Sequence, residues 1–246
     1  MTRVAVVAGG GEHTGPAVAL RLAAGGFDVA LLGSGFTSAD KTVRRVEEYG
    51  RQCITVRAEL TDARSVAVAF GRVRTALSSP AVLVTCVGPE PLPDGLPEDA
   101  SADEQRYTAV RRALRPAFVC CQAGAGRLLR HRRGRIIIVV AEPADAAENT
   151  WRTTGPVLDG LIGFTRSAAL ELARSGTTVN LVAPADRADD SRAPALRAAG
   201  DDSAGSYADG VAHVTEFLVD ERAVGITGQA IRVAAARADV PLLRER

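Results

Sequence analysis

A glycine-rich segment near the start of the chain has the residue types and spacing that could hold a phosphate group. Ala8 ends an apolar run and is followed by Gly-Gly-Gly-Glu-His-Thr-Gly, which closes at Gly15. Glycines in such a turn let the backbone bend sharply and approach a pyrophosphate closely. Gly9 and Gly15 are therefore candidate binding residues. Glu12 opposes them because its carboxylate would repel a diphosphate, and His13 would fill space that a bound nucleotide needs.

Acidic residues in the loops that follow apolar segments are further candidates for chemistry. Two carboxylates in one crevice could separate their pKa values and work as an acid and a base. The residues concerned are Glu90, Glu142, Asp145 and Asp186. The alternative, an ordinary solvated loop, is the interpretation we favour, since loops are polar in any case. Asp186, Asp189 and Asp190 match no metal-site spacing, so no metal is predicted. His13 as an acid or base is also open, although a lone histidine more often has no catalytic role.

Composition excludes several classes of partner. The chain has 246 residues, a net charge of +1 and 46% hydrophobic residues. Nothing in this balance favours nucleic acid or an anionic membrane. No apolar run has the length of a signal peptide or a membrane span, of which the latter needs about 18 residues. The four cysteines lie in apolar patterns without metal-ligand spacing, which is typical of free thiols in a reducing compartment. We therefore expect a cytoplasmic protein.

Alternating strand and helix patterns must position these residues. The expected strands are residues 4–8, 27–32, 53–57, 81–86, 136–140, 178–182 and 230–233; the expected helices are residues 14–24, 38–49, 62–77, 103–130, 156–174 and 210–219. This order predicts a doubly wound, Rossmann-like parallel sheet in three α/β/α layers. We expect a single domain over 1–246. Ligands of such a sheet bind outside the carboxyl ends of its strands.

Several segments together resemble the short-chain dehydrogenase/reductase family over nearly the whole chain. The matching segments are Gly134-Arg135-Ile136, Leu60-Thr61-Asp62, residues 161–173, residues 178–184 and Ile226-Thr227-Gly228-Gln229. The resemblance implies the doubly wound fold. It also implies a tyrosine, a lysine, a serine and an asparagine that carry out carbonyl reduction with a nicotinamide cofactor.

The positions of that tetrad hold other residues in this chain. The tyrosine and lysine positions fall on Thr154 and Leu158, upstream of Gly163, and the serine and asparagine positions fall on Ala141 and Ala113. A threonine hydroxyl is a far weaker acid than a phenol, and the chain's one lysine, at position 41, comes too early to help it. The loss of a positioned acid typically lowers a rate by about 10²- to 10⁴-fold. The three tyrosines, Tyr49, Tyr107 and Tyr207, do not align with the crevice. We therefore predict no residue of the classical catalytic type.

The resemblance also implies a set of cofactor contacts, and this set is incomplete. Positions near the family pattern are Gly9, Gly15, Glu59, Leu60 and Gly88. The second strand should end with an acidic residue for a ribose hydroxyl or a basic one for a 2′-phosphate, but Leu32 leads into Gly-Ser-Gly. Pro184 is followed by alanine where the family has glycine. We predict no cofactor, and NAD(P) if any.

The hypothesis that follows is a divergent member of the family without classical redox catalysis. It would act as a non-catalytic subunit, a pseudoenzyme, or as a scaffold for a small-molecule ligand. The alternatives are a non-redox enzyme in the old crevice and a weak NAD(P)-dependent ketoreductase. Members of the family pair through the two helices expected at 103–130 and 156–174. The apolar residues expected in that interface include Phe118, Val119, Cys121, Leu161 and Phe164. We therefore expect a homo-oligomer, or a hetero-oligomer with an active homologue.

Overall fold

A computed structural model describes residues 3–11, 14–36, 39–88, 100–128, 133–141, 151–184 and 202–233. Side chains are not described for 100–103, 127–128, 151–154 and 202–206. The strands are β1 (Arg3–Ala8), β2 (Phe27–Gly33), β3 (Cys53–Arg57), β4 (Val82–Val87), β5 (Arg135–Val140), β6 (Thr178–Pro184) and β7 (Ala230–Val233). The helices are α1 (Gly15–Ala24), α2 (Ala39–Glu48), α3 (Ala63–Ala76), α4 (Ala100–Leu128), α5 (Trp151–Leu172) and α6 (Asp202–Val219), with 3₁₀ turns at Ala173–Ser175 and Glu221–Ala223.

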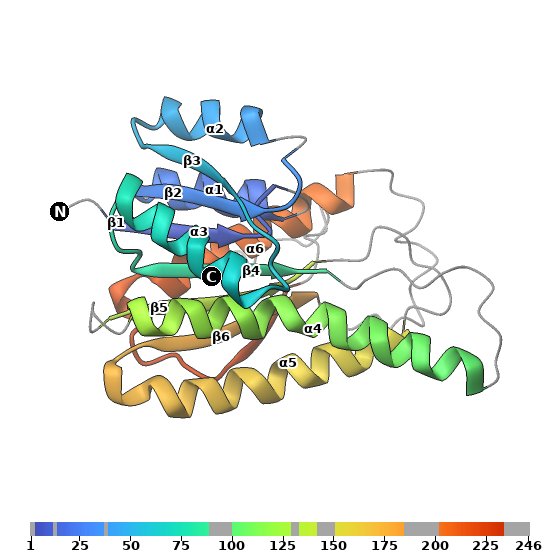
Figure 1. The fold of residues 1–246 in the computed structure, drawn as a ribbon. Helices are drawn as coiled ribbons and strands as arrows, with labels where there is room; N and C mark the ends of the chain where they lie inside the picture. The colour runs from blue at the N-terminus through green and yellow to red at the C-terminus, as the bar shows by residue number, and fades with distance from the viewer. Residues whose placement is uncertain are drawn as a thin grey trace, which may run out of the picture.

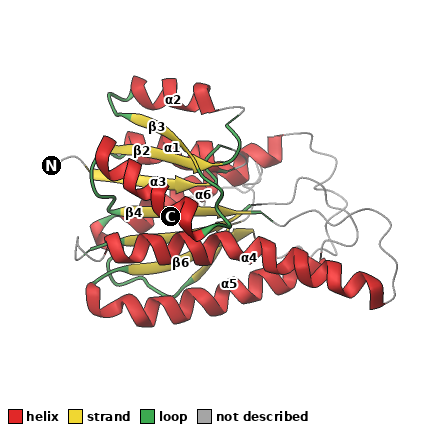
Figure 2. Cartoon of the chain, in the orientation of Figure 1, coloured by secondary structure: helices red, strands yellow, loops and turns green. Residues whose placement is uncertain are grey.

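The seven strands form one parallel sheet in the order β3-β2-β1-β4-β5-β6-β7. Helices cover both of its faces (Figures 1 and 2). Alternate residues of each central strand enter different cores: Val4 and Val6 pack toward α3, α4 and α5, whereas Ala5 and Val7 pack toward α1, α2 and α6. Because both faces of these strands are buried, their sequences are continuous apolar runs. The predicted Rossmann-like fold is confirmed.

Element boundaries differ from the sequence expectation at several helix ends. α3 begins at Ala63, one residue after the expected start, because Asp62 caps it: its carboxylate accepts from the Ser65 amide at 2.7 Å. α6 begins at Asp202, eight residues before the expected start at Gly210. α4 begins at Ala100, before the expected start at residue 103, and continues through Pro116. Packing along the sheet outweighs such local signals.

No helix in the described part of the chain combines the length and the apolar character needed to cross a membrane.

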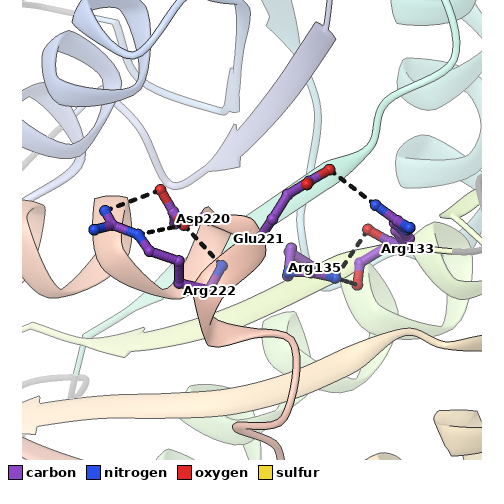
Figure 3. A network of polar contacts seen from close by, with 6 residues as sticks. Arg133, Arg135, Asp220, Glu221 and Arg222 are labelled. Atoms are coloured by element: carbon purple, nitrogen blue, oxygen red, sulfur yellow. Dashed lines mark hydrogen bonds and ion pairs between the residues drawn. The ribbon is translucent and has the colours of Figure 1, made fainter.

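The amino edge of the sheet is held by a network of polar contacts (Figure 3). Arg135, at the start of β5, is 3% exposed and donates to the carbonyls of the two preceding residues at 3.0 and 3.2 Å. Burial, followed by the nearby guanidinium of Arg133, lowers the pKa of Arg135. Arg133 itself pairs with Glu221 at 2.9 Å, and Arg222 with Asp220 at 2.9 Å. The Arg133–Glu221 pair joins the residues before β5 to the 3₁₀ turn after α6, and the Arg222–Asp220 pair lies at that turn.

A second set of contacts at this edge joins β6 to the segment before β7. The side chain of Asn180, 0% exposed, donates to the carbonyl of Ile226 at 2.8 Å and accepts from the amide of Gln229 at 3.1 Å. The hydroxyl of Thr227 accepts from the amide of Val179 at 3.1 Å. The Ile-Thr-Gly-Gln motif therefore provides hydrogen-bond partners for the Val179 amide and the Asn180 side chain in β6.

Candidate functional site

The described tetrad positions lie at the carboxyl edge of the sheet and are buried. Ala113 on α4 is 5% exposed, Ala141 after β5 is 3% exposed, and Leu158 on α5 is 9% exposed. Ala113 and Leu158 belong to the same apolar cluster as Val140. Thr154 lies on the backbone of α5, one turn before Leu158, and its side chain is not among those described. The fold thus brings these positions together, and the described side chains there are aliphatic.

The glycines of the first loop are required by close backbone contacts. Gly9 has a φ of +75°, and its amide donates to the Leu32 carbonyl at 2.7 Å. A Cβ on Gly9 would lie 2.6 Å from the carbonyl oxygen of Cys86, and a Cβ on Gly15 would lie 2.5 Å from the Cα of Gly10. Any side chain would displace the backbone at either position. The glycine spacing is therefore accounted for by packing, with or without a phosphate.

The segment after β2 folds against the same loop. A Cβ on Gly11 would lie 2.6 Å from the carbonyl oxygen of Gly35. Gly33, at the end of β2, presents no side chain to a ribose, and its carbonyl accepts from the Ala58 amide at 2.9 Å. The two residues predicted to oppose a nucleotide, Glu12 and His13, lie outside the described residues.

The remaining predicted cofactor positions follow the ends of β3 and β4. The exposed carboxylate of Glu59 accepts from the hydroxyl of Thr61 at 2.6 Å and from its amide at 3.1 Å. These bonds, the hydroxyl first, lower the pKa of Glu59. Leu60 is half-buried and Gly88 is exposed. Glu59, Leu60 and Gly88 thus reach the same edge as the glycine loop, but the carboxylate of Glu59 is already bonded within its own turn.

A tyrosine that the sequence analysis placed away from the crevice lies at this edge. Tyr207 on α6 is 2% exposed, and its hydroxyl donates to the carbonyl of Val140 at 2.7 Å. The ladder between β5 and β6 begins with the Thr178 amide donating to the Gly134 carbonyl. Steps of two residues along this parallel ladder make the amide of residue 184 the donor expected for the Val140 carbonyl. Proline has no N–H, so the Tyr207 hydroxyl replaces the missing donor.

The structural role of Tyr207 could not be predicted from its place in the sequence. Its position on α6 matches no catalytic motif, and the helix starts earlier than its apolar pattern indicates. The available signal was Pro184 at the end of a buried strand, because such a proline leaves one carbonyl on the neighbouring strand in need of a donor.

Comparison with known proteins places the chain in a family. The family model for short chain dehydrogenases matches residues 3–195. The chain belongs to the short-chain dehydrogenase/reductase family. It is 93% identical to the short-chain dehydrogenase/reductase family member NovK of Streptomyces niveus, over 100% of both chains. It is 30% identical to the 3-oxoacyl-[acyl-carrier-protein] reductase FabG of Staphylococcus aureus, over 95% of this chain and 97% of the reductase.

A solved structure agrees with this assignment. The acetoin dehydrogenase from Enterobacter cloacae superposes with a TM-score of 0.73 at 27% identity, covering 95% of each chain. The chain is thus a homologue of short-chain oxidoreductases, and it has a seven-stranded parallel sheet covered by helices.

The described residues fit a short-chain dehydrogenase cofactor only in part. Gly9 and Gly15 provide the turn that the family uses. Leu158, however, is the residue predicted at the position of the family's lysine, and an aliphatic side chain offers neither charge nor hydrogen bond. No reaction step through a nicotinamide can be assigned to the described side chains of Ala113, Ala141 and Leu158.

The cysteines near the crevice are poor nucleophiles. Cys86, at the end of β4, and Cys120, on α4, are free thiols. Burial raises the pKa of each to about 12. Because the thiolate is the reactive form, both stay protonated and unreactive at neutral pH.

The acidic loop residues considered above, Glu90, Glu142, Asp145, Asp186, Asp189 and Asp190, lie outside the described residues. Within the described ranges, no cluster of histidine, cysteine and acidic residues is suited to hold a metal ion.

Proposed function

We propose that the chain is a non-catalytic member of the short-chain dehydrogenase/reductase family that acts as a structural subunit or ligand scaffold. One observation carries this proposal: Ala113 and Leu158, at the asparagine and lysine positions, are part of the hydrophobic core. General acid catalysis needs a titratable group within hydrogen-bond reach of the substrate. The aliphatic side chains of Ala113 and Leu158, in the same cluster as Val140, supply no titratable group. Ala141 adds only a methyl group.

Weak or absent cofactor binding belongs to the same proposal. A nucleotide gains affinity from charge-assisted hydrogen bonds to its ribose and phosphates. Leu158 and Gly33, at the two predicted ribose positions, supply neither a charge nor a side-chain hydrogen bond. The carboxylate of Glu59 already accepts a hydrogen bond from Thr61. Backbone amides near Gly9 are the remaining donors, and the carboxylate of Glu12 lies in the same loop.

A titration tests this function. Calorimetry of the purified protein with NADH and with NADPH should give no saturation in the micromolar range, with a catalytically active family member as the positive control. Micromolar affinity for either nucleotide would contradict the weak or absent cofactor binding that belongs to this proposal.

The subunit role requires a pairing surface, and the outer face of α4 and α5 offers one. Phe118 is 45% exposed, and its ring lies 4.2 Å, centroid to centroid, from that of Phe164. Leu170 is 79% exposed on the same helix as Phe164. An apolar face of this kind is suited to a two-fold contact, either with a second copy or with an active homologue.

The composition of that surface differs from the sequence expectation. Val119, Cys121 and Leu161 were expected in the interface, but they are 7%, 5% and 0% exposed and pack inside their own chain. The helices α4 and α5 lie side by side (Figure 1). One face of each helix therefore packs in the core of its own chain, and another face is exposed.

Light scattering tests the pairing. The purified chain should form a dimer or larger assembly at micromolar concentration, and Phe118→Asp should shift it toward monomer, with Tyr49→Asp, on an exposed site of another element, as the control. A monomeric wild-type chain would exclude self-assembly and leave only the form paired with a homologue.

A further inference from the structure

A recess between α4 and the turn before α3 gathers positive charge. It has a volume of about 350 Å³ and is lined by Thr61, Arg111, Arg112 and Arg115. All three arginines are exposed, and they lie on neighbouring turns of one helix. The first turns of α4 project beyond the carboxyl edge of the sheet (Figure 1).

Two of these arginines repel each other across one turn of the helix. Residues four apart on a helix face are neighbours, so Arg111 and Arg115 are a like-charge pair. Arg115 donates through Nε to the carbonyl of Thr61 at 2.5 Å, which fixes its guanidinium over the turn. Arg111 lies 6.0 Å from the centroid of the Tyr107 ring. Within the described part of the chain, neither Arg111 nor Arg115 forms an ion pair with a carboxylate.

In the described part of the chain, two carboxylates near the recess already accept hydrogen bonds. Glu59 is bonded to the hydroxyl and amide of Thr61, and Arg112 contributes only the last of the effects that shift the pKa of Glu59. Asp62 is used as the cap of α3. Arg111 and Arg115 therefore lie near two carboxylates, those of Glu59 and Asp62, that are already hydrogen-bonded within the turn.

We propose that this recess binds the phosphate group of a small phosphorylated molecule. Guanidinium groups match the geometry of phosphate oxygens and can donate two parallel hydrogen bonds to them. A dianion between Arg111 and Arg115 would relieve their repulsion. A volume of about 350 Å³ exceeds that of a single phosphate and falls within the range of small-molecule sites, about 300–1,000 Å³. The site stands on α4 and the β3–α3 turn, elements separate from the glycine loop.

Calorimetric titrations at low ionic strength test the proposal with three probes: inorganic phosphate, glycerol 3-phosphate and, as the neutral comparison, glycerol. Both phosphates should bind saturably, glycerol should not bind, and added salt should weaken binding because the site is exposed. The double variant Arg111→Gln/Arg115→Gln should lose affinity by about tenfold or more, since each charge-assisted hydrogen bond contributes roughly one factor of ten. Arg112 is left unchanged in this test.

The matched control is Arg72→Gln/Arg74→Gln, which removes two exposed arginines from α3 away from the recess. It should bind both phosphates as the wild type does, and circular dichroism should show both double variants folded. Absence of saturable phosphate binding, binding retained by Arg111→Gln/Arg115→Gln, or an equal loss in the control would each overturn the proposal. The last outcome would report overall charge and not a site.

Discussion

The two edges of the sheet are built from different kinds of side chain. At the amino edge, Arg135 and Asn180 are buried polar residues. Arg135 donates to the carbonyls of the two residues before β5, and Asn180 connects β6 to the segment before β7. At the carboxyl edge, where the family places its chemistry, Ala113 and Leu158 are buried and aliphatic. Buried polar side chains hold the amino edge, while the described side chains at the predicted catalytic positions are aliphatic. Fold and chemistry are therefore separable demands on this chain.

The largest effect is expected from a charge at the carboxyl edge. Leu158→Lys places an ammonium in an apolar cluster, where burial lowers a lysine pKa by about three units, equivalent to about 4 kcal/mol of lost stability at neutral pH. The unfolded chain then binds the proton more tightly, so the variant should regain stability as pH rises toward the ordinary lysine range. Urea denaturation at several pH values measures this.

Leu158→Met is the control for that prediction, because it conserves volume and should cost less than about 1.5 kcal/mol. A lysine variant as stable as the methionine variant at pH 7 would show that the position still accommodates a cation. The contrast between the two edges would then fail.

A somewhat smaller loss is expected at the amino edge from Asn180→Leu. The change leaves the Ile226 carbonyl and the Gln229 amide without their partner. Two buried unsatisfied groups cost about 3 kcal/mol together. Thermal or urea unfolding measures the difference, and Gln52→Leu, at an exposed amide side chain, should be close to neutral. If both substitutions are equally mild, the amino-edge network does not stabilise the fold.

Tyr207→Phe should produce a moderate loss, because one polar contact at the carboxyl edge is structural. The variant keeps the ring and removes the hydroxyl that donates to Val140. Since Pro184 cannot donate in its place, we expect a loss of about 1–2 kcal/mol. Tyr49→Phe, at a side chain that is 50% exposed, is the control. Unchanged unfolding of Tyr207→Phe would mean that water satisfies the carbonyl.

The smallest effect is expected at Glu59, which is exposed. Thr61→Val removes the hydroxyl that contributes most to the low pKa of Glu59 but keeps the amide bond. The pKa should therefore rise part of the way to its ordinary range, as followed by an NMR titration of the carboxyl group. A lowered pKa stabilises the fold above the unfolded pKa, and this contribution disappears as pH falls through the folded value. Any stability difference from the wild type should accordingly be present at pH 7 and shrink in acid.

How far prediction from sequence succeeds can be seen in three places. The apolar runs of β1 and β5 predicted buried parallel strands, because a strand covered on both faces has no polar face to show. The start of α6 was placed eight residues late, since its first turns carry few apolar residues. Tyr207 was placed away from the crevice because its contact joins residues 67 apart.

The sequence by itself determined the order of the strands and helices, the family, and the residue types at the tetrad positions. These follow from local patterns of apolar residues, glycines and fixed spacings. The tertiary structure alone decided that Ala113 and Leu158 join one core, that the Tyr207 hydroxyl replaces an amide that Pro184 lacks, and that three arginines of α4 face the Thr61 turn. Each of these depends on the distance between elements far apart in the chain, and such distances are set by packing across the sheet.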